Sequence, residues 1–319
     1  NKRYLILAPD TKAVLPKGYD LKQHTPEAVV KRMADDGAVC VKVFIEDGFG
    51  LRNDWPMISK ALLKRVRTAA TKHGLLMMAH ANAYDMQEIA VEAQVDIIAH
   101  GMWNWIQFND QAGLPEELRK LLDKVVSNNI VVQPTFSVMD GLRSITVPDI
   151  MKDPLYEKVV SANALSWYQS DAGQWFKEVV IKNYDNMPLA EIQRHQEGKI
   201  AQGERVIQYL KAQGLPIVLA SDTPSAPLFV SQPGYSTFKE LQHLFKVGLT
   251  YQEVLAAATI NNAKAFGLSD KYGTVEPGKI ANLLLLNKSP LHTIDAYNAI
   301  DRVILKGKVL NRESLAVKQ

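Results

Sequence analysis

Short apolar runs alternate with longer segments of helical periodicity along most of the chain. This alternation is typical of repeated βα units, in which helices cover a buried parallel sheet. The apolar runs predict strands at Tyr4–Ala8, Val39–Ile45, Leu75–His80, Val95–His100, Ile130–Phe136 and Ile217–Asp222. We therefore expect an α/β protein whose units form a barrel.

The segments between the predicted strands carry residues that commonly begin a helix. A threonine caps a helix with its hydroxyl, and a proline fits the first turn, where its missing N–H is not needed. A glutamate three residues after a capping threonine completes a capping box. The predicted starts are Thr25 with Pro26, Pro56 for a helix that runs to Gly74, Pro115, and Thr250 with Glu253.

Two regions depart from the βα repeat. Asp140–Lys199 is rich in Trp, Tyr and amphipathic stretches, and we interpret it as a helical insertion over the mouth of the barrel. Gly273–Leu310 contains apolar runs separated by glycines, which predicts strands outside the barrel. The predicted domains are a barrel over residues 1–268, with the insertion at about 140–199, and a small β-appendage over residues 269–319.

The composition of the 319 residues is that of a globular protein, because 47% hydrophobic residues can fill a large core. The single cysteine, Cys40, excludes an internal disulfide. The 37 basic and 34 acidic residues are mixed along the chain, and no apolar run approaches the roughly 18 residues of a membrane span. We expect a soluble homo-oligomer of the cytoplasm or the periplasm that acts on a small molecule, without nucleic-acid or membrane partners.

The alternation of side chains along Val39–Ile45 gives Lys42 a distinct position. Val41 and Val43 share the face that suits contact with helices, so Lys42 points the other way, into the barrel. An ammonium there needs an anion or a metal, or must lose its charge. The alternative is a lysine at the barrel mouth that reaches out to solvent.

Three further polar residues end predicted strands after apolar runs: His80, His100 and Asp222. Each alone has a structural explanation, since a histidine at a strand end is often only packed and an aspartate often caps a helix. Equivalent ends of parallel barrel strands, however, meet at one rim. With Lys42, these residues form a nitrogen and oxygen set that suits one or two ions of Zn²⁺ or a similar divalent metal.

Three stretches carry a resemblance to a known family: AHANAYDMQEIAVEAQVDIIAHG, IVLASDTP and GLTYQEVLAAATINNAKAFGLSDKYGTVEPGKIANLLLLNKSPL. They are similar to the fifth and sixth strands, the eighth strand and the closing segment of the amidohydrolase superfamily, in its imidazolonepropionase-like and prolidase-like branch. The resemblance covers nearly all of the chain. It implies a (β/α)8 TIM-type barrel with a small β-sandwich appendage.

The resemblance also implies roles for the four polar residues. Lys42 matches the strand-four lysine, which in this branch is commonly carboxylated and bridges two metals, and His80 and His100 match ligands of the second metal. Asp222 matches the aspartate that binds the first metal and shuttles the proton. A metal-activated hydroxide would then hydrolyse a C–N bond of an amide, a dipeptide or a cyclic amide.

The chain departs from the family's pattern at its start. The family's first strand carries a His-x-His pair, which none of the seven histidines of this chain forms. Fewer strands are predicted than the eight that close a barrel. We therefore expect an N-terminal segment of the same protein, about the first quarter of the enzyme, to complete the barrel.

Two more residues are candidates for substrate binding: Tyr84, just beyond His80, and Arg143, soon after the seventh strand. Their structural alternatives are a tyrosine that covers a helix start and a solvated arginine.

Two functions compete. The first is a metal-dependent hydrolase of C–N bonds, although deamination and ester hydrolysis could take place at the same site of the barrel. The second is a non-catalytic amidohydrolase-like scaffold or binding protein that has lost its first metal site.

Overall fold

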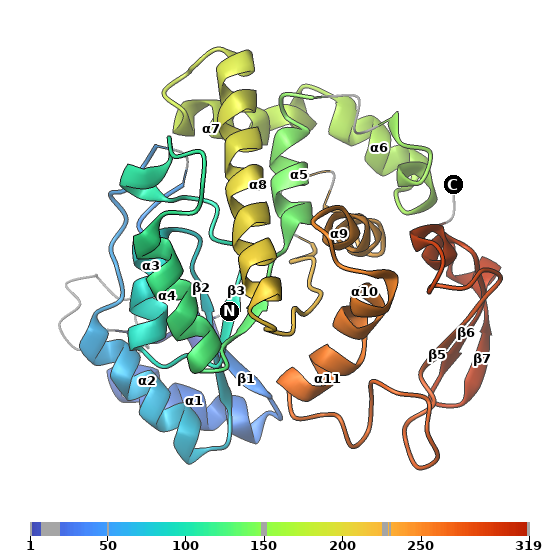
Figure 1. Cartoon of the computed structure of the whole chain (residues 1–319), viewed down its shortest axis with the longest axis horizontal. Helices are drawn as coiled ribbons and strands as arrows, with labels where there is room; N and C mark the ends of the chain where they lie inside the picture. The colour runs from blue at the N-terminus through green and yellow to red at the C-terminus, as the bar shows by residue number, and fades with distance from the viewer. Residues whose placement is uncertain are drawn as a thin grey trace.

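A parallel sheet of four strands lies at the centre of the described chain (Figure 1). The computed structural model describes residues 2–7, 20–49, 51–147, 152–224, 229 and 231–317. The strands are ordered β1-β2-β3-β4 and comprise β1 Cys40–Phe44, β2 Leu76–His80, β3 Ile97–Ala99 and β4 Val131–Gln133. Each strand pairs with the next one along the chain, as repeated βα units require.

Helices connect the strands and cover one face of the sheet (Figure 1). They are α1 Pro26–Asp35 before β1, α2 Lys60–Lys72, α3 Tyr84–Glu92 and α4 Glu116–Ser127. The Thr25 hydroxyl accepts the Ala28 N–H at 3.2 Å, which confirms the predicted start of α1. The predicted start of α2 at Pro56 was wrong, because Ser59 caps this helix through the Leu62 N–H.

The side chains of β1 alternate as the sequence predicts. Val41 and Val43 are buried in the core against the helices, whereas Lys42 and Phe44 lie on the exposed face. The helices bury matching apolar faces, such as Leu118, Leu121, Leu122 and Val125 of α4. Burial of these residues provides the main driving force for the fold.

Two predicted strands do not form among the described residues, and a third ends earlier than predicted. None of the described residues in Tyr4–Ala8 is in a strand, because Lys2–Tyr4 forms a 3-10 helix that binds Asp36 through Arg3 and Tyr4; Ala8 lies outside the described residues. Strand β4 stops at Gln133, since Pro134 lacks an N–H and Thr135 is left-handed. In Ile217–Asp222, Ile217 makes an isolated parallel bridge to Val132.

The region predicted as a helical insertion is helical, and its first helix begins at Phe136. These helices and those that follow are α5 Phe136–Arg143, α6 Ala162–Gln169, α7 Trp175–Asn183, α8 Leu189–Ala212, α9 Tyr235–Lys246, α10 Tyr251–Ala258 and α11 Ile260–Ala265. The capping box of Thr250 and Glu253 is present at the start of α10, as predicted. Further 3-10 turns cover Leu21–His24, Ile106–Phe108, Tyr156–Lys158 and Ala172–Gln174.

A separate antiparallel sheet closes the described chain, at the right of Figure 1. Its strands are β5 Leu283–Leu286, β6 Ile300–Leu305 and β7 Lys308–Asn311. Short 3-10 turns at Ile294–Asn298 and Arg312–Leu315 flank β6 and β7. The predicted strands outside the barrel are therefore present, as a single three-stranded sheet in the described residues. Among the helices described above, none has the length and apolar character to cross a membrane.

Candidate active site

Two histidines meet at the carboxyl ends of neighbouring strands. His80 is the last residue of β2, and His100 directly follows β3, which pairs with β2 so that His80 lies beside Ala99. The centroids of the two imidazoles are 4.4 Å apart, with the rings at 71°. Sequence positions in consecutive βα units thus become direct neighbours at one rim of the sheet.

One ring nitrogen of His100 is buried and has no hydrogen-bond partner among the described residues. The residue is 1% exposed, and its Nδ1 lies 2.6 Å from the Thr135 hydroxyl oxygen. Its Nε2 has no hydrogen-bond partner among the described residues. Burial, together with the nearby His80 and Lys42, lowers the pKa of His100 well below its ordinary value. The ring is therefore neutral near pH 7, and a neutral imidazole has a lone pair for a metal.

His80 lies in a partly aromatic setting. Phe44 stacks on its ring with centroids 4.3 Å apart, and its Nε2 is 3.1 Å from the side-chain Nδ2 of Asn82. Burial, with a contribution from Lys42, lowers the pKa of His80 to about 4. Both imidazoles of the pair are therefore uncharged at neutral pH.

Lys42 and Asp222 form the second pair of predicted residues. The Lys42 Nζ is 3.6 Å from Asp222 Oδ1, and the two side chains are 44% and 36% exposed. Lys42 extends from the open face of β1, and Asp222 follows the segment that bridges β4 at Ile217. The structure therefore brings Lys42 to Asp222 and His80 to His100, with the lysine close enough to influence both histidines.

The donor atoms of the two pairs suit a divalent metal. Imidazole nitrogens and carboxylate oxygens are ordinary zinc ligands, and the unpartnered Nε2 of His100 is the kind of atom that a ligand satisfies. In the part of the chain that the structure describes, however, no three His, Cys, Asp or Glu side chains are gathered closely enough to hold an ion. The residues are therefore chemically suited to a divalent metal ion, and they lie as two neighbouring pairs.

Glu46 is a site residue that the strand analysis did not single out. It is buried, its Oε2 accepts the Asn82 N–H at 2.8 Å, and the same atom is 3.7 Å from His80 Nε2. Burial raises the pKa of this carboxyl to about 8. The signal was present in the sequence, because Glu46 continues the alternation that begins with Lys42 and Phe44.

Tyr84 and Arg143 have other partners in the structure. The Tyr84 hydroxyl donates to Glu88 at 3.0 Å within α3, and burial raises the pKa of the phenol to about 12. Arg143 is at the end of α5, where its Nη2 is 3.5 Å from Asp140 Oδ1. Neither contact joins these residues to the two pairs described above.

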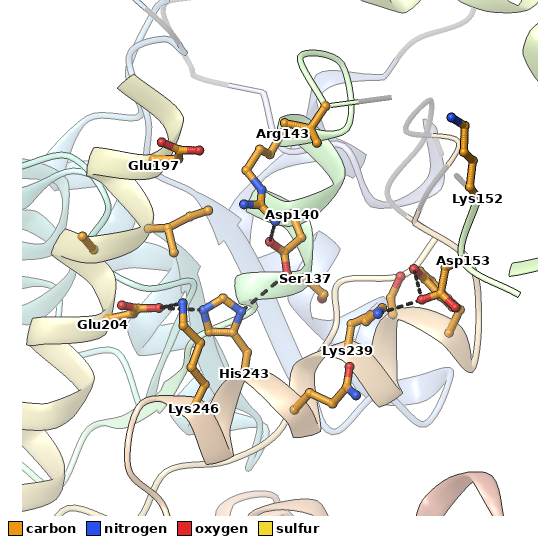
Figure 2. A pocket seen from close by; sticks show the side chains of 16 residues that line it. Ser137, Asp140, Arg143, Lys152, Asp153, Glu197, Glu204, Lys239, His243 and Lys246 are labelled. Atoms are coloured by element: carbon orange, nitrogen blue, oxygen red, sulfur yellow. Dashed lines mark hydrogen bonds and ion pairs between the residues drawn. The ribbon is translucent and has the colours of Figure 1, made fainter. Parts of the chain in front are cut away.

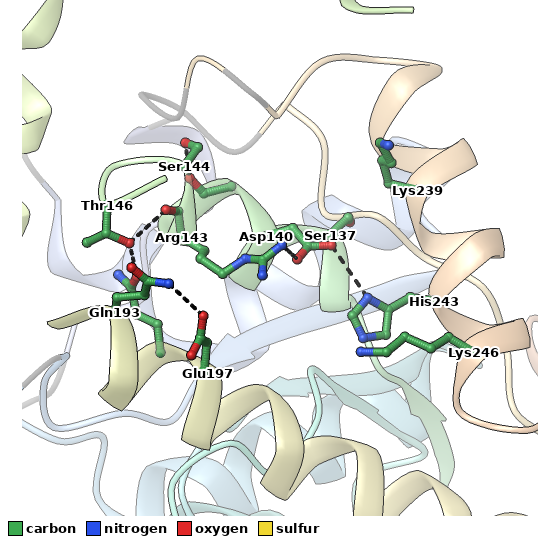
Figure 3. Close-up of polar contacts among 12 residues, drawn as sticks. Ser137, Asp140, Arg143, Ser144, Thr146, Gln193, Glu197, Lys239, His243 and Lys246 are labelled. Carbon is green, nitrogen blue, oxygen red and sulfur yellow. Dashed lines mark hydrogen bonds and ion pairs between the residues drawn. The ribbon is translucent and has the colours of Figure 1, made fainter. Parts of the chain in front are cut away.

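Arg143 lines a pocket of about 870 Å³ between α5, α8 and α9 (Figure 2). Among its described lining residues none belongs to the Lys42–Asp222 or His80–His100 pairs. Most of the charged side chains that line this pocket form ion pairs with one another. His243 lies between Asp140 and Glu204 (Figure 2). Its Nδ1 is 3.5 Å from Asp140 Oδ2 (Figure 3), and its Nε2 is 3.0 Å from Glu204 Oε1. This pocket is therefore distinct from the histidine rim.

The sequence of the chain matches the profile of the Amidohydrolase family over residues 8–310. This match covers far more than half of the chain and includes both pairs of site residues. The chain belongs to the amidohydrolase family. The predicted family is therefore confirmed, and the parallel sheet with its covering helices fits the TIM-barrel-like fold of amidohydrolases.

Individual amidohydrolases resemble parts of the chain. It is 30% identical over 121 residues to an imidazolonepropionase of Alkaliphilus oremlandii, a match of 35% of this chain and 26% of that protein. A 5-methylthioadenosine/S-adenosylhomocysteine deaminase of Teredinibacter turnerae is 28% identical over 110 residues, 33% of this chain and 25% of that protein. These matches span about a quarter of each relative's length.

A solved structure shares the fold over nearly the whole chain. It is a Xaa-Pro dipeptidase with methionine bound in its active site, and it superposes with a TM-score of 0.60 at 19% identity. The superposition covers 95% of this chain and 64% of the dipeptidase. This chain therefore spans less than two thirds of the solved relative.

Proposed function

We propose that this protein is a metal-dependent amidohydrolase that hydrolyses a C–N bond in an amide, a dipeptide or a cyclic amide. One observation carries the proposal. The buried Nε2 of His100 faces no hydrogen-bond partner within the described residues, while its Nδ1 is bonded to Thr135 and its ring adjoins that of His80. A histidine held by one nitrogen with the other left for an ion is the usual arrangement of a metal ligand.

His80, His100, Asp222 and Lys42 would hold the metal, for which we propose Zn²⁺ as one or two ions. When bound, the ion supplies an activated water near neutral pH and polarises the scissile carbonyl. A carboxylated Lys42 is part of the proposal, because the free ammonium that pairs with Asp222 is not itself a metal ligand. Carboxylation would convert it into an oxygen donor on the same strand.

Asp222 is the proposed proton shuttle. Its carboxylate is partly exposed at the rim, so it can take a proton from the attacking water and donate it to the leaving nitrogen. His80 and His100 remain neutral at working pH because burial lowers the pKa of both rings. The aromatic rings of Phe44 and Phe49 contact the ring of His80. Substrate contacts by Tyr84 and Arg143 remain predictions.

The relatives support the substrate class. An imidazolonepropionase acts on a cyclic amide and a Xaa-Pro dipeptidase on a dipeptide, as their names state. The similarity to a deaminase favours deamination as a second reaction for the same site. A non-catalytic scaffold or binding protein is the competing function, and its support is that none of the seven histidines of this sequence forms a His-x-His pair.

Metal content and hydrolysis together test the proposal. The natural full-length protein is purified with Zn²⁺ and assayed for bound metal, and is then tested against dipeptides, N-acyl amino acids, cyclic amides and nucleobases. We expect bound zinc and hydrolysis of at least one C–N substrate, both lost after chelation and restored by Zn²⁺. Zinc with turnover of nucleobases alone would assign deamination, and a protein with neither zinc nor turnover would be a scaffold.

A further inference from the structure

Glu240 is a fully buried carboxylate that meets the start of α5. The residue is 0% exposed, and its Oε2 accepts the backbone N–H of Ser137 at 2.7 Å. A buried carboxyl group needs such partners, and the first turn of a helix offers both unpaired N–H groups and the positive end of the dipole. Glu240 thus fixes the position of a turn that it does not belong to, since it comes from α9.

The turn that Glu240 holds is bonded to one proposed metal ligand and to the residue directly before another. The hydroxyl of Thr135 lies 2.6 Å from His100 Nδ1. Two residues on, the Ser137 hydroxyl donates to the carbonyl oxygen of Ser221 at 3.2 Å, directly before Asp222. Residues 135–137 therefore connect ligands that come from different βα units.

The backbone at these ligands is strained. His100, Thr135 and Asp222 have φ angles of 82°, 53° and 50°, in the left-handed region that residues with a Cβ rarely adopt. Such conformations persist only where the surroundings determine them strongly. A turn whose Thr135 is left-handed needs a support, and the Glu240 carboxylate is bonded to that turn.

We propose that Glu240 is a positioning residue of the metal site, which acts on His100 through Thr135 and on Asp222 through Ser137 and Ser221. The inference rests on the proposed function, because it concerns the same ligands. If Glu240 were only an ordinary cap of α5, its loss would lower stability and leave the affinity for metal unchanged. Metal affinity therefore separates the two roles.

The test uses isosteric variants of the natural full-length protein. Glu240→Met keeps the volume and removes the acceptor, whereas Glu240→Gln keeps an oxygen for the Ser137 N–H. Zinc affinity is measured by competition with a chromophoric chelator, and the absorption spectrum of the cobalt-loaded protein reports the ligand geometry. We expect Glu240→Met to weaken zinc binding by about 10- to 100-fold and to alter the cobalt spectrum, and Glu240→Gln to stay within about threefold of wild type.

Thr135→Val cuts the next bond in the same chain of contacts. We expect this substitution to weaken zinc binding by about 10- to 100-fold. The double variant with Glu240→Met should bind zinc with the same affinity as the single variant that binds it more weakly, because both changes break the same chain of contacts. If the decrease in zinc affinity of the double variant equalled the product of the two single decreases, the proposal would be overturned. Unchanged affinity in Thr135→Val would also overturn it, and this holds even if Glu240→Met fails to fold.

Glu253→Met is the matched control, because Glu253 also accepts a backbone N–H at a helix start, that of Thr250 at 2.7 Å. It should lower the melting temperature and leave zinc affinity unchanged. The inference would be overturned, without affecting the proposed function, if zinc affinity fell equally in this control. The same would follow if the Glu240→Met variant bound zinc like wild type. A wild-type protein without any zinc affinity would overturn the proposed function first.

Discussion

The ammonium of Lys42 and the carboxylate of Asp222 lie 3.6 Å apart at the rim of the sheet. Exposed ion pairs of this kind contribute little to stability, about 0 to 1 kcal/mol. The fold nevertheless brings the pair together beside His80 and His100. A functional reason for the pair is therefore more convincing than a structural one, and it leads to the first prediction.

Asp222→Asn should lower kcat by about 100- to 10,000-fold, because the amide cannot take up and deliver the proton. The stability of the protein should barely change, since the side chain is partly exposed. Steady-state kinetics on the substrate found by the library assay measure the effect, with thermal unfolding alongside. Asp110→Asn, at an exposed position outside the site, is the matched control and should retain full activity. An Asp222→Asn enzyme with wild-type kcat would rule out the shuttle.

His100→Ala should reduce zinc affinity by at least about 100-fold, because it removes the buried Nε2 donor. His80→Ala should act in the same direction. The measurement is equilibrium dialysis against Zn²⁺ with elemental analysis of the protein. His292→Ala, at an exposed histidine, controls for loss of imidazole in general. If the variants His100→Ala and His292→Ala bound zinc equally well, His100 would not be a ligand.

Leu118→Ala should destabilise the protein by about 2 to 5 kcal/mol, because Leu118 is completely buried in the core under α4 and the substitution leaves a cavity. Leu284→Ala is the matched change at a residue that is 51% exposed, and it should cost less than about 1 kcal/mol. Urea unfolding followed by circular dichroism compares the two free energies of unfolding. Similar costs at both positions would contradict the assignment of the core.

The stability of the folded protein should depend on the protonation of Glu240. Burial raises the pKa of this carboxyl from 4.5 to about 7, so the folded state holds the proton more tightly than the unfolded state does. As the pH rises from 4.5 towards 7, the unfolded state ionises first and the free energy of unfolding falls, by on the order of 3 kcal/mol in total. Above both pKa values the contribution is constant.

Glu240→Gln tests this dependence, since glutamine does not titrate. The free energy of unfolding is measured at about pH 5 and about pH 8 for both proteins. Wild type should lose more stability over this interval than the variant does. His243 acts in the same direction: burial opposes protonation, but Asp140, Glu240 and Glu204 raise its pKa overall. Replacement of Glu240 also removes its contribution to the pKa of His243, which adds to the difference in the same direction. Equal losses would show that Glu240 does not ionise as described.

Local sequence rules predicted the features that depend on a single element. The alternation in β1 separated Val41 and Val43 from Lys42, and side-chain caps at Thr25 and Thr250 marked the helix starts. Both rules rely on neighbours within a few residues. The same rules failed at Tyr4–Ala8, where bonds of Arg3 and Tyr4 to Asp36 decide the conformation.

The site could be predicted only in part. His80 and His100 follow apolar strands in consecutive units, so the sequence shows that they meet. Glu46 could have been found from its alternation with Lys42. Glu240 could not, because its carboxylate accepts the N–H of Ser137, which lies 103 residues earlier in the chain. Contacts between distant elements leave no periodic signal.

The left-handed backbone at His100, Thr135 and Asp222 has a consequence for the evolution of this protein. Each of these residues costs about 1 kcal/mol or more in a conformation that glycine adopts freely. Selection for stability alone would replace them by glycine or asparagine. Descendants that lose the proposed catalytic activity should therefore drift to these smaller residues, and the three positions would then distinguish active from inactive relatives of this protein.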